Sequence, residues 1–202
     1  MLHTVIFIGR SGCGKGTQSA LLKEWILGRD LEKRHILDVE TGAKFREFIR
    51  SDSYSAKLSK AIYMSDRLQP NFLACIMWGD MLVSELEENM HLFFDGAPRS
   101  RPEAEILTTA LEFYGRKRPK VINISVSRKW SEEKLLARGR FDDMNLEKID
   151  KRLDWFDKDV MPAIEYFKQN AFYDYIEVNG EQTIEKVHED ILKSYDHYLQ
   201  NI

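Results

Sequence analysis

The stretch "TVIFIGRSGCGKGTQ", Thr4 to Gln18, decides the fold. A short apolar run leads into a loop whose four glycines let the backbone turn with its amides pointing inward. The amphipathic segment that follows would direct the positive end of a helix at the same spot, and Lys15 adds a full charge. A tight strand-to-helix turn without a ligand is the alternative. Because GxxxxGK stands at a strand-helix junction, the stretch favours a phosphate-binding loop.

Short apolar runs alternate with longer amphipathic stretches along the rest of the chain. Five runs are typical of strands buried on both faces: 4–9, 35–40, 91–96, 121–127 and 173–180. Three stretches carry apolar residues at helical spacing: 17–27, 70–89 and 145–170. Alternation of this kind predicts an α/β fold, a P-loop NTPase-like five-stranded parallel sheet with helices on both faces. We expect residues 1–202 to form one domain.

The composition limits the classes of function. The 30 basic and 33 acidic residues give a net charge of -3, so neither nucleic acid nor an anionic membrane is expected as the main partner. The two cysteines lack CxxC spacing, which favours a reducing compartment without a disulfide or zinc framework. We find no signal leader and no run long enough to span a membrane. We therefore expect a soluble cytoplasmic protein.

The loop resembles "GxxGxGKGTQ", the phosphate loop of the adenylate kinase family, in which Gly-Thr replaces the usual hydroxyl after lysine. The resemblance implies that the loop binds ATP through Gly12, Cys13, Gly14, Lys15, Gly16 and Thr17. Other P-loop kinases of small molecules share much of this loop. It therefore indicates a nucleotide donor and leaves the second substrate open.

Two further stretches resemble the segment of the family that binds the nucleoside monophosphate (NMP). "DVETGAKFREFIR" carries Thr41, Gly42 and Arg46 at the positions of TG-x-x-x-R. "YMSDRLQP" occupies the position of G-x-L-V-P, where Leu68 and Pro70 agree and Asp66 replaces the glycine. The resemblance implies a small NMP-binding insertion at 41–70. Within it, Tyr63, Leu68 and Gln69 would join the acceptor site.

The third apolar run continues into "FFDGAPRSRPEA", which resembles the family's DGFPRTxxQA. Asp95, Gly96 and Arg99 match, and Glu103 stands where those enzymes have the glutamine that reads adenine. The resemblance implies that Gly96 and Arg99 contact the acceptor. It also implies that Asp95, with Thr17, serves Mg²⁺, largely through water.

The stretch "KLLARGRFDDMNLEKIDKRL" resembles the lid and the helix after it. The residues that match are Arg138, Arg140, Asp142, Asp143 and Arg152. Residues 138–144 would form a very short lid, because a single glycine separates its first two arginines. Lys134 stands where the family has an arginine stacked on the donor adenine. We expect Lys134 and Arg138 to contact ATP.

Taken together, the resemblance implies a short-lid nucleoside monophosphate kinase that uses ATP and Mg²⁺. Lys15, Arg99, Arg138, Arg140 and Arg152 would be catalytic, because offsetting the charge of two phosphate chains is the main task. Thr41 resembles the AMP-specific members of the family, which implies AMP as the acceptor, so that ATP and AMP give two ADP. A UMP/CMP or other NMP kinase and a noncatalytic nucleotide-binding module remain as alternatives. We expect a monomer.

Overall fold

A computed structural model of the chain describes residues 1–138 and 146–200, the last four by their backbone alone. One parallel sheet has the strand order β2-β3-β1-β4-β5. The strands are β1 (Thr4–Gly9), β2 (Ile36–Glu40), β3 (His91–Asp95), β4 (Lys120–Ser125) and β5 (Asp174–Asn179). Each lies within one or two residues of the run that predicted it. The predicted fold class is confirmed.

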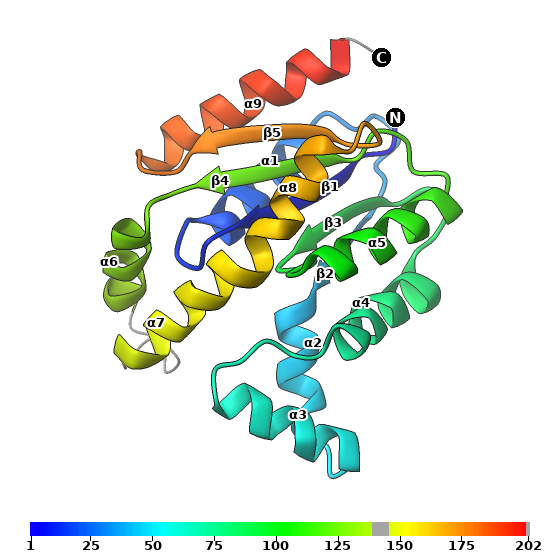
Figure 1. Cartoon of the computed structure of the whole chain (residues 1–202). Coiled ribbons are helices and arrows are strands. Elements are labelled where there is room, and N and C mark those ends of the chain that lie inside the picture. Colours follow the sequence, from blue (N-terminus) through cyan, green and yellow to red (C-terminus); the bar gives the residue numbers. More distant parts are fainter. Residues whose placement is uncertain (139–145, 201–202) are drawn as a thin grey trace.

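Helices cover both faces of the sheet (Figure 1). They are α1 (Lys15–Leu27), α2 (Thr41–Phe48), α3 (Tyr54–Met64), α4 (Asn71–Glu85), α5 (Arg101–Phe113), α6 (Arg128–Arg138), α7 (Leu146–Trp155), α8 (Met161–Gln169) and α9 (Ile184–Gln200). Helices α4, α5 and α8 pack against one face and α1 and α9 against the other.

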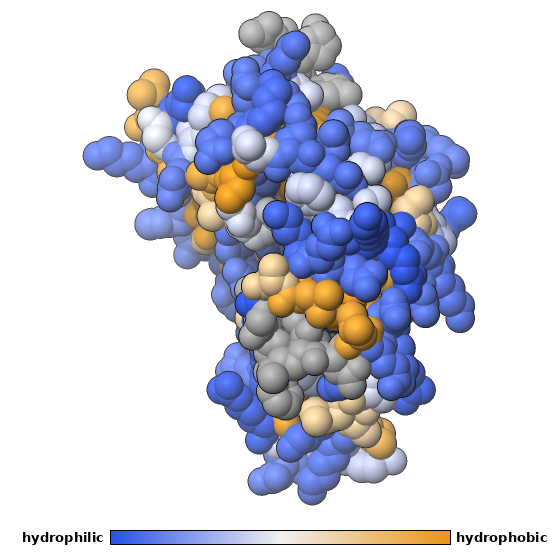
Figure 2. All heavy atoms as spheres, turned by 90° about the vertical axis from the view of Figure 1, so that its left-hand side faces the viewer, coloured by the Kyte–Doolittle hydropathy of each residue, from blue (hydrophilic) through white to orange (hydrophobic). Residues whose placement is uncertain are grey.

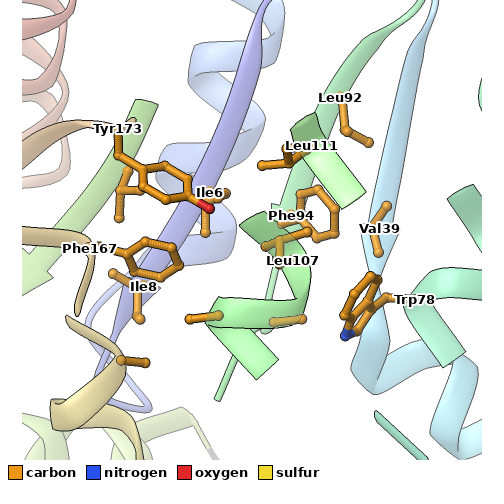
Figure 3. Packing of buried hydrophobic residues seen from close by; sticks show 14 of the residues in the cluster. Ile6, Ile8, Val39, Trp78, Leu92, Phe94, Leu107, Leu111, Phe167 and Tyr173 are labelled. Atoms are coloured by element: carbon orange, nitrogen blue, oxygen red, sulfur yellow. The ribbon is translucent and has the colours of Figure 1, made fainter. Parts of the chain in front are cut away.

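The core follows from the period of two in each strand. Successive side chains point to opposite faces, so Ile6 and Ile8 enter one cluster while Val5 and Phe7 enter the other. Figure 3 shows the first cluster, in which side chains of β1, β2 and β3 meet those of α4, α5 and α8. Strands buried on both faces explain why their sequences are continuously apolar.

The strand register places the candidate site at the carboxyl edge of the sheet. Phe7 of β1 pairs with Asp95 of β3, and Gly9 pairs with Ile124 of β4. The glycine-rich loop after β1 therefore starts between the ends of two neighbouring strands. Figure 1 shows α2 and α3 extending away from the sheet on one side of this edge, with α6 and α7 on the other.

The long helical stretch predicted at 145–170 is divided in the structure. A π-helical turn, η2 (Phe156–Val160), separates α7 from α8. Pro162 lies at the start of α8 and has no backbone N–H, so it cannot complete the regular ladder of i to i−4 bonds there. The sequence pattern did not predict this turn.

Candidate active site

The glycine-rich loop joins β1 to α1 in a shape that needs glycine. Gly9, Gly12 and Gly14 have φ angles of 145°, 83° and 94°. At Gly9 a Cβ atom would lie only 2.6 Å from the carbonyl oxygen of Ile124, so no side chain fits. Helix α1 begins at Lys15 without a side-chain cap. Its first backbone N–H groups are therefore available to an anion.

The ammonium group of Lys15 lies inside this loop. It donates hydrogen bonds to the carbonyl oxygens of Gly9, at 2.7 Å, and Arg10, at 2.9 Å. Arg10 in turn anchors the loop to the π-helical turn. Its guanidinium lies 4.5 Å from the centroid of the Phe156 ring, and its Nη2 lies 2.5 Å from Oδ1 of Asp157. An ion pair with Asp157 and a cation–π contact with Phe156 thus connect the loop to η2.

Asp95 ends β3 close to the start of α1. A Cβ atom on Gly16 would lie 3.5 Å from Oδ2 of Asp95, so this carboxylate borders the residue that precedes Thr17. The side chain of Asp95 is only partly buried, and Thr17 is exposed. The predicted metal residues therefore lie at the same end of the loop.

Two arginines from different elements converge on Gly42. Arg46 lies on α2, which begins at Thr41, and Arg99 follows the cis Ala97–Pro98 peptide after β3. A Cβ atom on Gly42 would lie 3.3 Å from Nη1 of Arg46 and 3.8 Å from Nη2 of Arg99. Two like charges this close need an anion or a neighbouring carboxylate.

Arg99 is held from several sides. Its Nε donates a 2.6 Å hydrogen bond to the carbonyl oxygen of Gly96, and its guanidinium lies 5.9 Å from the centroid of the Trp155 ring. Burial lowers the pKa of Arg99, and the charge of Arg46 adds to this effect, while the charge of Glu103 opposes it. A negatively charged ligand beside the Arg99 guanidinium would therefore stabilise its charged form.

A cavity of about 290 Å³ joins these groups. Twelve of the predicted site residues line it: Lys15, Thr41, Gly42, Arg46, Tyr63, Leu68, Gln69, Gly96, Arg99, Glu103, Arg138 and Arg152. They come from the start of α1, from α2 and α3, from the connection between α3 and α4, from the segment after β3, and from α5, α6 and α7. Figure 2 faces this edge of the molecule and shows a largely hydrophilic surface with separate hydrophobic clusters.

The wall of the cavity contains two buried polar side chains. Thr41 is 3% exposed, and its hydroxyl makes no hydrogen bond with any residue that the structure describes. Glu103 is 4% exposed and accepts a 3.3 Å hydrogen bond from Ser100, the residue that caps α5. Burial raises the pKa of Glu103, while Arg99 and the Ser100 hydroxyl lower it. The side chain of Gln69 forms two hydrogen bonds with Ser59 of α3: its Oε1 accepts from the Ser59 hydroxyl, and its Nε2 donates to the Ser59 carbonyl oxygen.

Asp66 keeps the backbone conformation expected of a glycine. Its φ is 55°, in the left-handed region, and its carboxylate lies 3.5 Å from Nζ of Lys148 on α7. The ion pair joins the 41–70 segment to α7.

Lys134 does not line the cavity. Its ammonium lies 4.6 Å from the centroid of the Trp130 ring, one turn earlier on α6. Gly12, Cys13, Gly14, Gly16, Thr17 and Asp95 also lie outside the cavity wall, at the loop and at the end of β3. Arg140, Asp142 and Asp143 fall at 139–145, outside the described residues.

Comparison with known proteins identifies the family. A family model described as "Adenylate kinase" matches residues 7–172, from the first strand to the segment before β5. The chain belongs to the adenylate kinase family. Relatives named "Adenylate kinase" include a Porphyromonas gingivalis protein, 34% identical over 93% of this chain and 92% of the relative. Another, from Bacteroides fragilis, is 33% identical over 97% of this chain and 99% of the relative.

Membership of the adenylate kinase family makes the chain an ATP-dependent phosphotransferase that acts on a nucleoside monophosphate. No helix in the described parts of this kinase is long and apolar enough to cross a membrane.

Several cavity residues of this adenylate kinase family member were not predicted as site residues. Trp155 lines the cavity beside Arg99, and Phe45, Lys148 and Arg67 line it too. Phe45 lies one helical turn after Thr41 and Trp155 three residues after Arg152, so helical spacing from a recognised residue is the signal that could have found them.

Proposed function

We propose that this kinase transfers the γ-phosphoryl group of ATP to AMP and so forms two molecules of ADP. Lys15 and the loop amides hold the donor phosphates. Arg46 and Arg99 hold the acceptor phosphate, and Arg138, Arg140 and Arg152 surround the group in transfer. The observation that carries this proposal is the convergence of Arg46 and Arg99 on Gly42, in the same cavity that Lys15 lines.

Charge compensation is the central requirement of this reaction. The acceptor phosphate is already an anion near neutral pH, so the chain needs no general base to create the nucleophile. Repulsion between two phosphate chains is the barrier to their approach. Cations and oriented amides fixed in position before the reaction offset that repulsion without reorganisation.

The hydrogen bonds of Lys15 support its role with the donor. Its ammonium is held by two carbonyl oxygens of its own loop. A phosphate chain lying along the loop offers oxygens with a full charge, which are stronger acceptors than carbonyl groups. We propose that Lys15 exchanges its carbonyl partners for donor oxygens when ATP binds.

The side-chain oxygen atoms of Thr17 and Asp95 are suitable ligands for Mg²⁺. A hydroxyl and a carboxylate are oxygen ligands, the type that this ion prefers, and both lie near the first turn of α1. When bound, Mg²⁺ would neutralise charge on the donor phosphates. Thr17 would bind the ion directly, and Asp95 would orient its water shell.

Two observations support AMP as the acceptor. The hydroxyl of Thr41 is buried in the cavity without a partner among the described residues, so a ligand would satisfy it. Adenine needs one donor and one acceptor, for N1 and the amino group. Glu103 can supply both when its carboxyl is protonated, and its buried position favours that form.

We further propose that 41–70 binds the NMP, that 138–144 acts as the lid, and that both close over the substrates to exclude water. The ion pair between Asp66 and Lys148 supports a direct approach of the two sides. The chain would act as a monomer in the cytoplasm, and its two free thiols fit a reducing compartment.

A single panel of assays tests the acceptor. The purified chain is incubated with Mg-ATP and one of AMP, CMP, UMP, GMP or dTMP, and ADP formation is followed. The proposal predicts the highest kcat/KM with AMP. A higher value with CMP or UMP would assign a pyrimidine kinase instead, and no turnover with any of the five would favour a noncatalytic nucleotide-binding module.

A further inference from the structure

A second cavity, of about 420 Å³, lies at the opposite edge of the sheet. The first four residues, the connection from Tyr114 to Arg118 and Tyr195 of α9 contribute to its wall. Thr4 and Lys120 begin β1 and β4, so this cavity is at the amino ends of the strands, where Figure 1 marks the N-terminus. The phosphate loop is at their carboxyl ends. The two cavities are therefore separated by the length of the sheet.

Arg116 is the unusual residue in this wall. It is only 6% exposed, and its Nη1 donates a 2.8 Å hydrogen bond to the carbonyl oxygen of Met90. Its Nε is buried without an acceptor among the described residues, and none of their carboxylates forms a salt bridge with it. Burial lowers the pKa of Arg116. A buried guanidinium without a counter-charge is costly unless a ligand supplies one.

Other cations surround Arg116. Lys117, Arg118 and Lys120 also line the cavity, and no aspartate or glutamate is among its described lining residues. The carboxylate of Asp174 forms ion pairs with two of these cations: it lies 2.6 Å from Arg118 and 2.5 Å from Lys120. The whole chain carries a net charge of -3, so this concentration of cations is a local feature.

The neighbouring His3 is kept neutral mainly by burial. Burial lowers its pKa to about 4, and the charges of His91, the amino terminus and Lys120 add to the effect, while Asp30 opposes it. His3 donates or accepts a 2.8 Å hydrogen bond with Tyr195, and its backbone N–H donates to His91. The ring therefore lines the cavity in its neutral form near neutral pH.

We propose that this cavity binds a small organic phosphate monoester, at a site separate from the two nucleotide positions. A phosphate dianion matches several cations at once, and a guanidinium fork suits its oxygens. Leu2 and Tyr114 give the cavity apolar walls for the organic part of the ligand. Its volume lies in the range of known ligand pockets, roughly 300–1,000 Å³. The proposal does not depend on which NMP the kinase uses.

Nuclear magnetic resonance of the full-length, ¹⁵N-labelled chain tests this site, with phenyl phosphate as the probe and benzoate as its carboxylate counterpart. We expect phenyl phosphate to shift the amides of residues 1–4 and 114–120 in a saturable way and to bind more tightly than benzoate. Arg99→Ala should leave these shifts unchanged, because Arg99 belongs to the other cavity.

Variants of the wall make the test specific. Arg116→Gln should weaken phenyl phosphate binding at this site roughly tenfold or more, because it removes the buried guanidinium that is proposed to bind the phosphate. Lys117→Gln, which removes an exposed charge, should weaken it about two- to fivefold without changing Tm. Lys57→Gln also removes an exposed charge, on α3, and should have no effect.

Three results would overturn the proposal. One is the absence of saturable shifts in these amides. Another is equal binding by the wild type and Lys117→Gln, which remains decisive if Arg116→Gln fails to fold. The third is equal affinity for benzoate and phenyl phosphate, which would reject a phosphate site.

Discussion

The carboxylate of Asp66 lies 3.5 Å from the ammonium of Lys148, and this ion pair connects two segments that stand on opposite sides of the cavity. Asp66 adopts a φ of 55° just after α3, whereas Lys148 lies on α7. Asp66 thus combines a left-handed backbone conformation with a contact to a distant segment of the chain.

Three substitutions at Asp66 separate these two effects. Asp66→Asn keeps a residue that tolerates the left-handed region and loses only the ion pair, so we expect a destabilisation of about 0.2–1 kcal/mol. Asp66→Ala should cost about 1 kcal/mol more, because a Cβ without a local hydrogen bond disfavours this φ. Asp66→Gly should be more stable than Asp66→Ala. Urea unfolding measures all three, and equal values for Ala and Gly would contradict the backbone explanation.

Arg99 should be essential for turnover and dispensable for folding. Removing one guanidinium from the acceptor phosphate in Arg99→Ala should lower kcat with ATP and AMP by roughly 10²–10³. We expect circular dichroism to show an intact fold.

Arg101→Ala is the matched control for Arg99. Arg101 lies two residues away, its side chain is 61% exposed, and it forms an ion pair with Glu105 on the same helix. Its removal should leave kcat within about twofold of the wild type. Similar losses in both variants would show that the effect is not specific to the cavity.

Glu103 should make AMP use depend on pH. Burial raises the pKa of its carboxyl, and only the protonated form can donate to N1 of adenine. We therefore expect kcat/KM for AMP in the wild type, divided by that of Glu103→Gln, to fall as pH rises from about 5 to about 8. The ratio cancels the titration of AMP itself, which both proteins share. A ratio independent of pH would mean that Glu103 does not read the base.

His3 should destabilise the fold in acid. Its folded pKa is about 4, below the ordinary value of 6.5, so its contribution to stability is present above pH 6.5 and is lost as pH falls through this window. The total is at most about 3 kcal/mol. Urea unfolding measured at several pH values between about 4 and 6.5 gives the change of the unfolding free energy with pH. This change should be smaller for His3→Gln than for the wild type. His35 is exposed, and His35→Gln should keep the wild-type change of the unfolding free energy with pH.

Local patterns predicted the parts of the site that one segment can form alone. The turn at Gly9 to Gly14 and the sheet follow from glycine spacing and apolar runs. Such features depend on residues a few positions apart.

Contacts between distant segments were not predictable in this way. The sequence gives no sign that Lys134 lies over Trp130, that Asp66 pairs with Lys148, or that a π-helical turn follows Trp155. The unpartnered Arg116 likewise becomes visible only when the amino edge of the sheet is assembled. In each case tertiary packing, rather than local propensity, selects the arrangement.

Transfer of labelled phosphate between bound nucleotides tests the central claim most directly. The purified chain is given AMP, Mg²⁺ and ATP labelled at the γ-phosphate, and the products are separated. If the cavity brings donor and acceptor phosphates together as described, the label appears in ADP and the amount of labelled ADP equals the AMP consumed. Label released as inorganic phosphate, with AMP unchanged, would contradict this account.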